Sequence, residues 1–281
     1  MPFLPRFRRG SGVAVIELHG SIGTRVRETM YGKLLSDVAT NRRYRALLLD
    51  IQSPGGSASA SEALYLSVAR VAAQKPVVAY IRNMGASGGY YIACGASKVT
   101  ALPSALVGSI GVIYLRPIME QLLGRAGIEV SVVKGGRLKD MGGFWRSPTD
   151  EESEKLQGLI SEIYESFLAV VMAGRSMSDE QARELATGEV FTARRGKEIG
   201  LVDELMDFDQ SLQLAGQLAG IEPGKAKPRW LRPRRTFSEK LTGRPAGHAP
   251  AVGILGPDLP RLLTGGVFYL DPSALLGNPY D

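Results

Sequence analysis

Short runs of β-forming residues alternate with helical patterns from residue 12 to about residue 220, and this alternation limits the folds open to the chain. The predicted strands, rich in Val, Ile and Leu, span residues 13–18, 46–51, 76–81, 98–101, 111–115 and 129–134. Helices are predicted over 59–74, 149–174 and 178–185, because each opens with a hydroxyl residue followed three positions later by Glu or Gln. Strands that alternate with helices predict an α/β fold with a mainly parallel sheet covered by helices.

The composition changes beyond about residue 222. Nine of the 16 prolines lie in that last fifth of the chain, together with most of the surplus behind the net charge of +6. Such a composition is typical of an extended, poorly packed segment. We therefore predict a basic arm over 1–11, one folded domain over 12–221 and a C-terminal extension over 222–281. Within the extension, the apolar run 265–270 is either a strand that docks elsewhere or part of a frayed tail.

Nothing in the sequence indicates a secreted or membrane-spanning protein. No apolar run approaches the roughly 20 residues of a spanning helix, and Glu17 interrupts the apolar segment after the basic N-terminus. Cys94 is the single cysteine, which rules out an intrachain disulfide and suits a reducing compartment. We expect a cytoplasmic protein with at most peripheral membrane contact. The basic stretch 227–235 is interpreted as a solvated linker, so nucleic acid is not an expected partner.

Ser87 lies in the stretch NMGASGGYYIA, residues 83–93, between a predicted strand and a short helical segment. The small residues around its hydroxyl allow another molecule to approach closely. A serine attacks only when a base removes its proton. His19 and His248 are the two histidines, and neither lies in a setting typical of a catalytic histidine. One cysteine and two distant histidines make a metal site implausible, and no cofactor is predicted.

A lysine can replace histidine as the base, provided that its surroundings lower its pKa by about three units from 10.4. Ser131 and Lys134 imitate the spacing of a serine–lysine pair in penicillin-binding enzymes. Residues 129–134 are predicted to be a strand, however, in which positions three apart face opposite sides. The companion motifs of those enzymes are also missing. This pairing is therefore rejected.

A second glycine turn, SPGG over residues 53–56, follows another predicted strand and precedes a capped helix. Backbone N–H groups at such a turn point outward at a helix N-terminus, where negative charge is favoured. The same holds for Gly88, the residue after Ser87. Two donors from two turns can form an oxyanion hole, which binds the charged oxygen that develops in acyl transfer. A Pro-Gly-Gly sequence by itself more often marks an ordinary turn.

Four motifs in this order and at this spacing, SPGG, GASGGYYIA, VGSIGV and GGRLKDMG, resemble the signal peptide peptidase A family of serine–lysine peptidases. The later stretch over residues 188–205 resembles a segment shared with the wider superfamily of the Clp protease subunit and crotonase. The resemblance covers about residues 12–220 and implies the crotonase-like (Clp protease-like) α/β spiral. It also implies a serine endopeptidase that cleaves short apolar peptides, such as remnant signal peptides, without a metal or an organic cofactor.

Position by position, the resemblance implies that Ser87 is the nucleophile and Lys139 the general base. It implies that Gly56 and Gly88 supply the oxyanion N–H groups, and that Ser109 hydrogen-bonds the lysine amine and orients it. In single-length relatives the serine and the lysine of one site come from neighbouring subunits. The resemblance therefore implies a ring-shaped homo-oligomer with sites shared between subunits.

For several residues, a simpler interpretation of their role remains open. Lys134 ends a predicted strand and lacks the KD context, but it remains a competing base. Ser109 is otherwise an ordinary turn serine. Tyr90 and Tyr91 are expected to pack their helix, and Cys94 is expected to be a small core residue.

Two features depart from the family pattern: many relatives carry an N-terminal membrane anchor, which is not expected here, and Gln52 stands where relatives commonly have Asn. Two other functions remain open. One is a catalytically silent ring-forming scaffold of the same fold. The other is a crotonase-type acyl-thioester enzyme, which needs a carboxylate base near the glycine turns. The C-terminal extension is predicted to occupy the groove of a neighbouring subunit and to be trimmed there by the enzyme.

Overall fold

The computed structural model describes residues 12–233 and 266–270. Its main sheet contains eight strands, which in chain order are β1 (Gly12–His19), β2 (Tyr44–Ser53), β4 (Val77–Ala86), β5 (Lys98–Ala101), β6 (Leu106–Gly108), β8 (Val190–Thr192), β9 (Glu204–Leu205) and β10 (Lys227–Leu231). Six of them follow in the order β10-β1-β2-β4-β5-β9, and each of these neighbours is parallel. β6 pairs parallel with β4 and antiparallel with β8. This arrangement confirms the predicted mainly parallel sheet.

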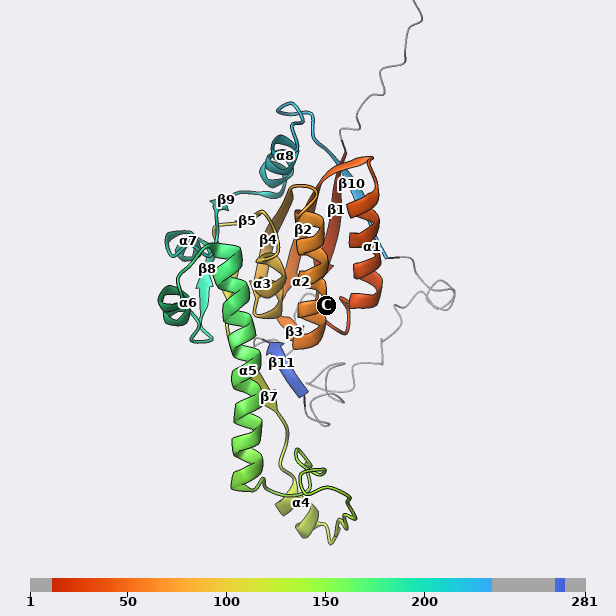
Figure 1. The fold of residues 1–281 in the computed structure, drawn as a ribbon, viewed down its shortest axis with the longest axis vertical. Coiled ribbons are helices and arrows are strands. Elements are labelled where there is room, and N and C mark those ends of the chain that lie inside the picture. The colour runs from red at the N-terminus through yellow and green to blue at the C-terminus, as the bar shows by residue number, and fades with distance from the viewer. Residues whose placement is uncertain (1–11, 234–265, 271–281) are drawn as a thin grey trace, which may run out of the picture.

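Helices cover both faces of this sheet (Figure 1). The helices of the described residues are α1 (Glu28–Thr40), α2 (Ala58–Ala72), α3 (Gly88–Ala93), α4 (Glu120–Arg125), α5 (Asp150–Arg175), α6 (Asp179–Leu185), α7 (Ala193–Glu198) and α8 (Phe208–Leu218), of which α4 lies away from the sheet. Alternate residues of a strand point to opposite faces of the sheet. Ile16 of β1 belongs to the larger core together with Leu64 of α2. Val15 belongs to a smaller core on the other face, together with Leu212 of α8. Apolar residues on both faces of a strand are typical of a parallel sheet buried between helices.

Five of the six predicted strands overlap observed strands, and 98–101 coincides with β5. The prediction of a strand over 129–134 is wrong, because these residues form no regular structure. Their Val-rich sequence favours an extended chain, but a strand also needs a neighbour for its backbone hydrogen bonds. No neighbouring strand lies beside them within the described part of the chain, and Val133 is fully exposed at 100%.

The three predicted helices are present in the structure, and only α2 begins at a different residue than predicted. α5 and α6 begin with the predicted capping boxes, with Thr149 and Ser178 as their N-caps. α2 begins earlier than predicted, because Ser57 rather than Ser59 is its N-cap. The Ser57 hydroxyl accepts a hydrogen bond from the Ala60 N–H at 3.5 Å. The chain turns into the helix directly from a short strand, so the first available hydroxyl residue becomes the cap.

A second, smaller sheet lies beside the first. Its strands are β3 (Gly55–Ser57), β7 (Ile113–Leu115) and β11 (Gly266–Leu270), in the order β3-β11-β7 with both pairs antiparallel. The strand alternative for residues 265–270 is therefore confirmed. β11 pairs with strands of its own chain. Occupation of a neighbouring subunit's groove and trimming of the extension stay predictions, and most of the extension lies outside the described residues.

The first part of the predicted extension contributes to the main sheet. β10 pairs in parallel with β1, in a register that sets Lys227 beside Gly12 and Leu231 beside Ile16. It forms one edge of the sheet. The predicted boundary at residue 222 stays a prediction, as does the N-terminal arm over 1–11, which lies outside the described residues.

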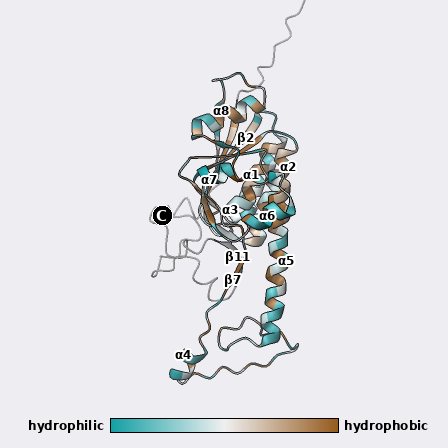
Figure 2. Ribbon diagram, turned by 90° about the vertical axis from the view of Figure 1, so that its left-hand side faces the viewer, coloured by the Kyte–Doolittle hydropathy of each residue, from teal (hydrophilic) through white to brown (hydrophobic). Residues whose placement is uncertain are grey.

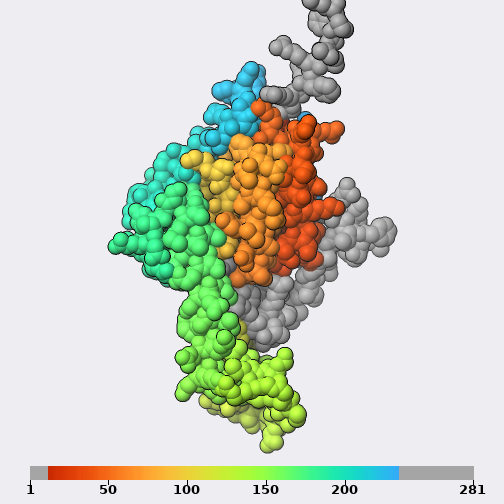
Figure 3. Space-filling model, viewed as in Figure 1, coloured from red at the N-terminus to blue at the C-terminus, as the bar shows by residue number. Residues whose placement is uncertain are grey.

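Residues 116–149 and the first half of α5 form an arm that projects from the body of the molecule (Figure 1), and the space-filling view shows its narrow connection (Figure 3). Figure 2 shows α4 near its far end. Seven of the ten large apolar side chains that are exposed among the described residues belong to this arm: Ile118, Leu122, Ile128, Val130, Val132, Val133 and Phe144. Contiguous exposed apolar surface usually marks an interaction surface. The arm therefore has the character of an interface.

α5 is long and apolar enough, by length and composition, to cross a membrane, and among the described residues it alone meets this test. Part of its apolar surface belongs to the core. Phe167, Leu168 and Val171 of α5 are fully buried, and the Phe167 ring lies 5.0 Å from the Tyr91 ring, centroid to centroid. These contacts hold α5 against α3, which begins next to Ser87.

Replacing Phe167 by Ala should lower the free energy of unfolding by about 3–5 kcal/mol, because it removes a fully buried ring and leaves a cavity. Urea denaturation followed by circular dichroism measures the change. Leu66→Ala is the matched control, since Leu66 is 47% exposed and its truncation should cost well under about 1 kcal/mol. Equal destabilisation by the two variants contradicts the packing described for α5.

Candidate active site

Ser87 occupies a strained turn between β4 and α3. It is the N-cap of α3 with φ +52° and ψ −119°, a conformation that non-glycine residues rarely adopt. Its N–H donates to the Gly108 carbonyl at 2.8 Å, and its carbonyl accepts from the Tyr91 N–H at 2.8 Å. Such a conformation costs about 1–3 kcal/mol and persists only when the surroundings enforce it, which is common at functional sites. The backbone bonds to Gly108 and Tyr91 do so here.

Ser109 is the neighbour of Ser87. β4 and β6 pair in parallel with Ala86 beside Gly108. Ser87 and Ser109 therefore directly follow two paired residues of adjacent strands. Ser109 also has a positive φ, +50°, and its N–H donates to the Glu189 carbonyl at 2.7 Å. Both serines are almost fully buried, at 1% and 5% exposed. The structure thus brings together two of the predicted site residues.

Gly56 can only be glycine at its place in β3. Its φ is +150°, and a Cβ there would lie 2.2 Å from the Ile22 carbonyl oxygen. The loop at Ile22 holds both neighbours of Gly56: the Ile22 N–H donates to the Gly55 carbonyl at 2.8 Å, and the Ser57 N–H donates to the Ile22 carbonyl at 3.0 Å. A side chain at Gly56 would therefore break the support of this turn.

The two predicted oxyanion donors come from elements that touch. α3 contacts both β2 and β3, and a Cβ at Gly89 would lie 3.0 Å from the Ser53 carbonyl oxygen, so the first turn of α3 lies tightly against the end of β2. Gly88 is the first residue of α3, where a backbone N–H has no acceptor within the helix. Gly56 lies in β3, next to this helix start. The arrangement is suited to two N–H donors that converge near Ser87.

Lys139 is not brought to this group of residues within one chain. It is exposed, in the turn region of the arm, and its backbone N–H donates to the Gly136 carbonyl at 3.2 Å. Its ammonium has no hydrogen bond or ion pair with any residue that the structure describes. Figure 1 shows the arm extending away from α3. Ser87 therefore lacks the predicted base in the single chain.

Lys134, the competing base, is bound to a carboxylate. Its ammonium donates to Asp140, which also accepts from the Arg146 guanidinium at 2.9 Å. The Lys134 ammonium thus takes part in the ion pairs of the arm. This contact was not foreseen from the sequence.

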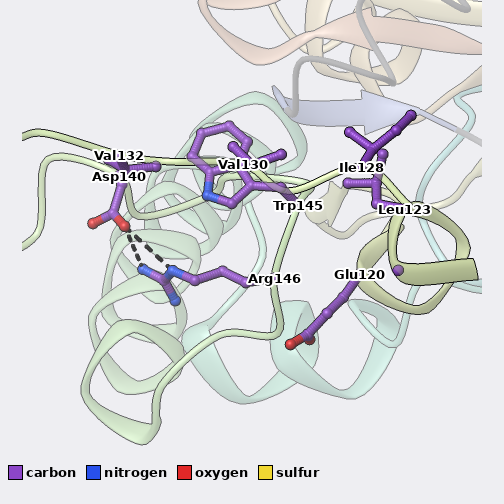
Figure 4. Close-up of a pocket in the computed structure, with 9 residues that line it drawn as sticks. Glu120, Leu123, Ile128, Val130, Val132, Asp140, Trp145 and Arg146 are labelled. Carbon is purple, nitrogen blue, oxygen red and sulfur yellow. Dashed lines mark hydrogen bonds and ion pairs between the residues drawn. The ribbon is translucent and has the colours of Figure 1, made fainter. Parts of the chain in front are cut away.

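An ion-pair cluster anchors the segment that carries Lys139, and Figure 4 shows the Asp140–Arg146 pair of this cluster. Arg146 binds Asp140 and also donates to the Glu152 carboxylate at 2.5 and 2.8 Å. Hydrogen bonds from Lys134 and Arg146 lower the pKa of the Asp140 carboxyl to about 2. The Arg146 guanidinium and the Thr149 N–H lower the pKa of Glu152 to about 2. Asp140 directly follows Lys139, so the cluster fixes the backbone at the predicted base.

Next to this cluster lies a cavity of about 350 Å³, with Trp145 and the apolar residues of the arm in its wall (Figure 4). Its lining consists of Glu120, Leu123, Gly124, Ile128, Val130, Val132, Asp140, Trp145 and Arg146. The sequence analysis missed Arg146 and Glu152, because six residues separate each pair in the cluster and no helical or strand period relates them.

The remaining predictions concern histidine and cysteine. His19 lies on the sheet face opposite α2, with its Nε2 3.5 Å from an Asp50 oxygen. Glu17 completes a group with ligand atoms close enough for a metal ion, but Arg82 already binds Asp50 with two nitrogens, at 2.5 and 3.2 Å. That guanidinium makes the group an ion-pair cluster and does not suit a bound cation. His248 lies outside the described residues.

Cys94, Tyr90 and Tyr91 are core residues, as predicted. Burial raises the pKa of the Cys94 thiol to about 12, which leaves it uncharged and unreactive. The buried Tyr90 hydroxyl donates to the Leu201 carbonyl at 2.7 Å, and the Tyr91 ring packs edge-to-face on Tyr65 at 5.3 Å. All three side chains support α3, and through it the position of Ser87.

Comparison with known proteins gives consistent matches. The sequence model of peptidase family S49 matches residues 69–222. A putative protease of Synechocystis is 36% identical over 231 residues, which cover 82% of this chain and 83% of that protein. Protease 4 of Salmonella typhi is 33% identical over 220 residues, covering 76% of this chain and 35% of that protein. The chloroplastic serine protease SPPA of Arabidopsis thaliana is 30% identical over 201 residues, covering 71% and 30%.

The sheet topology and these matches define a protease of the crotonase-like (Clp protease-like) α/β class. The chain belongs to peptidase family S49. This confirms the resemblance drawn from the four motifs. The chain spans most of the Synechocystis protein but only about a third of the other two relatives.

The anchoring cluster should make the arm sensitive to acid. Because the folded pKa values of Asp140 and Glu152 lie below the ordinary values of about 4, their ion pairs stabilise the arm fully above pH about 4 and are lost as the pH falls towards about 2. The protection of the amides of residues 134–149 against hydrogen exchange, relative to the intrinsic exchange rate at each pH, should fall over that interval. An arm whose protection stays unchanged down to pH 2 contradicts this role.

At neutral pH, Arg146→Gln should have the same loosening effect on the arm, because it leaves both carboxylates without their shared partner. Arg137→Gln is the matched control. Arg137 pairs with Glu151 on the surface of the same arm and is 72% exposed, so its loss should change exchange little. Equal exchange in the two variants counts against a special role for the cluster.

Proposed function

We propose that this protein is a serine endopeptidase with Ser87 as nucleophile and Lys139 as general base. The observation that carries the proposal is the strained turn at Ser87, held between β4 and α3 and beside Ser109. Such a turn presents one hydroxyl at the start of a helix, among residues small enough for a peptide to approach. The name of the Arabidopsis relative, a serine protease, supports the same class.

Peptide hydrolysis at this site follows from the residues around Ser87. The Lys139 amine takes the Ser87 proton while the Ser87 oxygen attacks the substrate carbonyl. The N–H groups of Gly56 and Gly88 hold the resulting oxyanion. When the C–N bond breaks, the protonated lysine passes its proton to the leaving amine and an acyl-enzyme remains. Lys139 then accepts a proton from water, which attacks the ester; as the C–O bond to Ser87 breaks, Lys139 returns the proton to the Ser87 oxygen and the second product leaves.

Assembly of several subunits completes the site in this proposal. A lysine serves as a base near pH 7 only when it is moved out of water, since burial disfavours its charged form. Lys139 is exposed in the single chain, and its arm carries most of the exposed large apolar side chains among the described residues. Docking of the arm on a neighbouring copy buries this surface and delivers Lys139 to that copy's Ser87. A ring of copies repeats this contact until it closes.

Ser109 has a positioning role in the assembled site. Support for this role comes from the backbone register, in which Ser87 and Ser109 directly follow the paired residues Ala86 and Gly108. A hydrogen bond to the Lys139 amine fixes its direction towards the Ser87 proton. Like Ser87, Ser109 has a positive φ, which is rare for a residue other than glycine.

Short apolar peptides, such as remnant signal peptides, are the proposed substrates. A putative signal peptide peptidase of Enterococcus faecium is 33% identical over 172 residues, 61% of this chain and 50% of that protein. Its name is the support for this substrate class. A cytoplasmic site of action with at most peripheral membrane contact belongs to the same proposal.

The first test compares Lys139→Ala with Lys134→Ala in the cleavage of fluorogenic apolar peptides. Loss of a general base should lower kcat/KM by about 10²–10⁴-fold for Lys139→Ala. Lys134→Ala is the matched control from the same arm, and it should retain most of the activity. The opposite ranking removes Lys139 from the mechanism.

A second test addresses the shared site. Ser87→Ala and Lys139→Ala subunits, each inactive alone, are co-expressed with different affinity tags and isolated as mixed assemblies. These assemblies should regain activity, because one copy supplies an intact Ser87 and its neighbour an intact Lys139. Mixed assemblies that stay inactive contradict sites built from two copies.

The two other functions predict different results. A silent scaffold assembles but does not react with a fluorophosphonate, whereas the proposed protease is labelled at Ser87 and the Ser87→Ala variant is not. An acyl-thioester enzyme needs a free carboxylate at the glycine turns. Asp50 is the carboxylate closest in sequence to the first turn, and it is fully buried and bound by Arg82. Thioester turnover that survives Ser87→Ala would favour that function instead.

A further inference from the structure

Ser53 lies where three parts of the active-site region meet: the end of β2, the loop after β1 and the first turn of α3. It is only 1% exposed. Its hydroxyl donates a hydrogen bond to the Gly20 carbonyl at 2.8 Å and accepts one from the Gly55 N–H at 3.1 Å. The proposed mechanism does not use this hydroxyl, although Ser53 stands three residues before Gly56.

Beside Ser53, the pairing of β1 with β2 continues into the loop after β1, but one backbone donor is missing. In a parallel pair, a residue gives its N–H to the residue before its partner and takes an N–H from the residue after its partner. The Gly20 N–H donates to the Gln52 carbonyl at 2.8 Å, which makes Ser53 the partner of Gly20. The residue after Ser53 is Pro54, which has no N–H to give to the Gly20 carbonyl.

The Ser53 hydroxyl takes the place of that missing donor, because it reaches the same Gly20 carbonyl from the partner residue itself. Backbone pairing then resumes at Ile22, whose N–H donates to the Gly55 carbonyl at 2.8 Å. The hydroxyl therefore closes a gap in the ladder of hydrogen bonds that leads to Gly56.

This ladder decides where the Gly56 N–H points. Successive residues of a strand direct their backbone groups to opposite sides. Gly55 and Ser57 both bind Ile22, with hydrogen bonds of 2.8 and 3.0 Å. The Gly56 N–H, one of the two proposed oxyanion donors, therefore points away from Ile22. If the turn rotates, this N–H rotates with it.

Ser53 also supports the second proposed donor. α3 begins at Gly88, and a Cβ on the next residue, Gly89, would lie 3.0 Å from the Ser53 carbonyl oxygen and 3.2 Å from its Cβ. The helix start thus packs directly on Ser53. An oxyanion hole works only when its donors lie about 2.7–3.1 Å from the charged oxygen. The distance between the turn of Gly56 and the start of α3 depends on Ser53.

We propose that Ser53 is a positioning residue for peptide hydrolysis: its hydroxyl replaces the N–H that Pro54 lacks and thereby aims the Gly56 N–H at the oxyanion. The inference rests on the proposed function, because it takes Gly56 and Gly88 as the oxyanion donors. Ser53 acts through the backbone of the turn and does not touch the substrate.

Ser53→Ala should lower kcat and leave KM nearly unchanged, because it removes the donor to Gly20 and the acceptor of the Gly55 N–H. Complete loss of one oxyanion donor costs about 10²–10³-fold in kcat. A displaced donor should cost less, about 10–10²-fold. A peptide aldehyde, to which Ser87 adds reversibly, puts its oxygen in the same hole and should bind more weakly by a similar factor. Fluorogenic peptides and inhibition constants measure both effects.

A double variant, Ser53→Ala with Pro54→Ala, separates positioning from a general loss of stability. It returns an N–H to residue 54, in the right place of the ladder to donate to the Gly20 carbonyl. This variant should recover a clear part of the kcat that Ser53→Ala loses. An equal loss in the single and the double variant overturns the proposal, as does a Ser53→Ala chain with unchanged kcat.

Ser211→Ala is the matched control for the loss of a buried hydroxyl. Ser211 is fully buried on α8, where its hydroxyl donates to the Asp207 carbonyl at 2.7 Å. It belongs to the other face of the sheet, so its loss should lower the melting temperature but keep kcat. A loss of kcat as large as that of Ser53→Ala reduces the effect to stability and overturns the positioning role.

Hydrogen exchange read by mass spectrometry gives a measurement that needs no catalysis. In Ser53→Ala, peptides that cover residues 20–22 and 55–57 should lose protection, and the double variant should regain it over 20–22. Unchanged protection in Ser53→Ala contradicts the part of the hydroxyl in the ladder. If protection changes as expected but even the unchanged chain cleaves no peptide, the proposed peptidase function is wrong and the ladder role of Ser53 is supported.

Discussion

The parallel pairing of β4 with β6 is the constraint on which the site depends. Ala86 and Gly108 are in register, so Ser87 and Ser109 leave adjacent strands at the same level. The hydrogen bond from the Ser87 N–H to the Gly108 carbonyl, 2.8 Å long, then holds Ser87 in a conformation with positive φ. Because the strands are buried in the main core, this strain is balanced by packing far from the hydroxyl.

The protein separates its reactive groups between a rigid body and a projecting arm. Ser87, Gly56 and Gly88 are fixed by the sheet and by α3, whereas Lys139 lies in the arm, on a backbone anchored by the ion pairs of Arg146. In the proposed mechanism, hydrolysis therefore depends on the docking of one copy's arm on another copy, because no single chain brings Lys139 to its own Ser87.

The small sheet covers two strand edges of the body. Without a partner, β3 and β7 would present unpaired backbone donors and acceptors, which are a liability for aggregation. In this chain β11 covers both edges.

The sequence alone determined the α/β class, most of the strands, two of the helix caps and the small residues around Ser87, because these depend on local periodicity and on residue size. It failed over residues 129–134, since a β-rich sequence forms a strand only where a partner exists. It also missed Arg146 and Glu152, which meet Asp140 across turns without a regular period. Only the tertiary structure decided that Lys139 lies apart from Ser87 and that β11 pairs with β3, because contacts between distant segments depend on how strands are ordered in space.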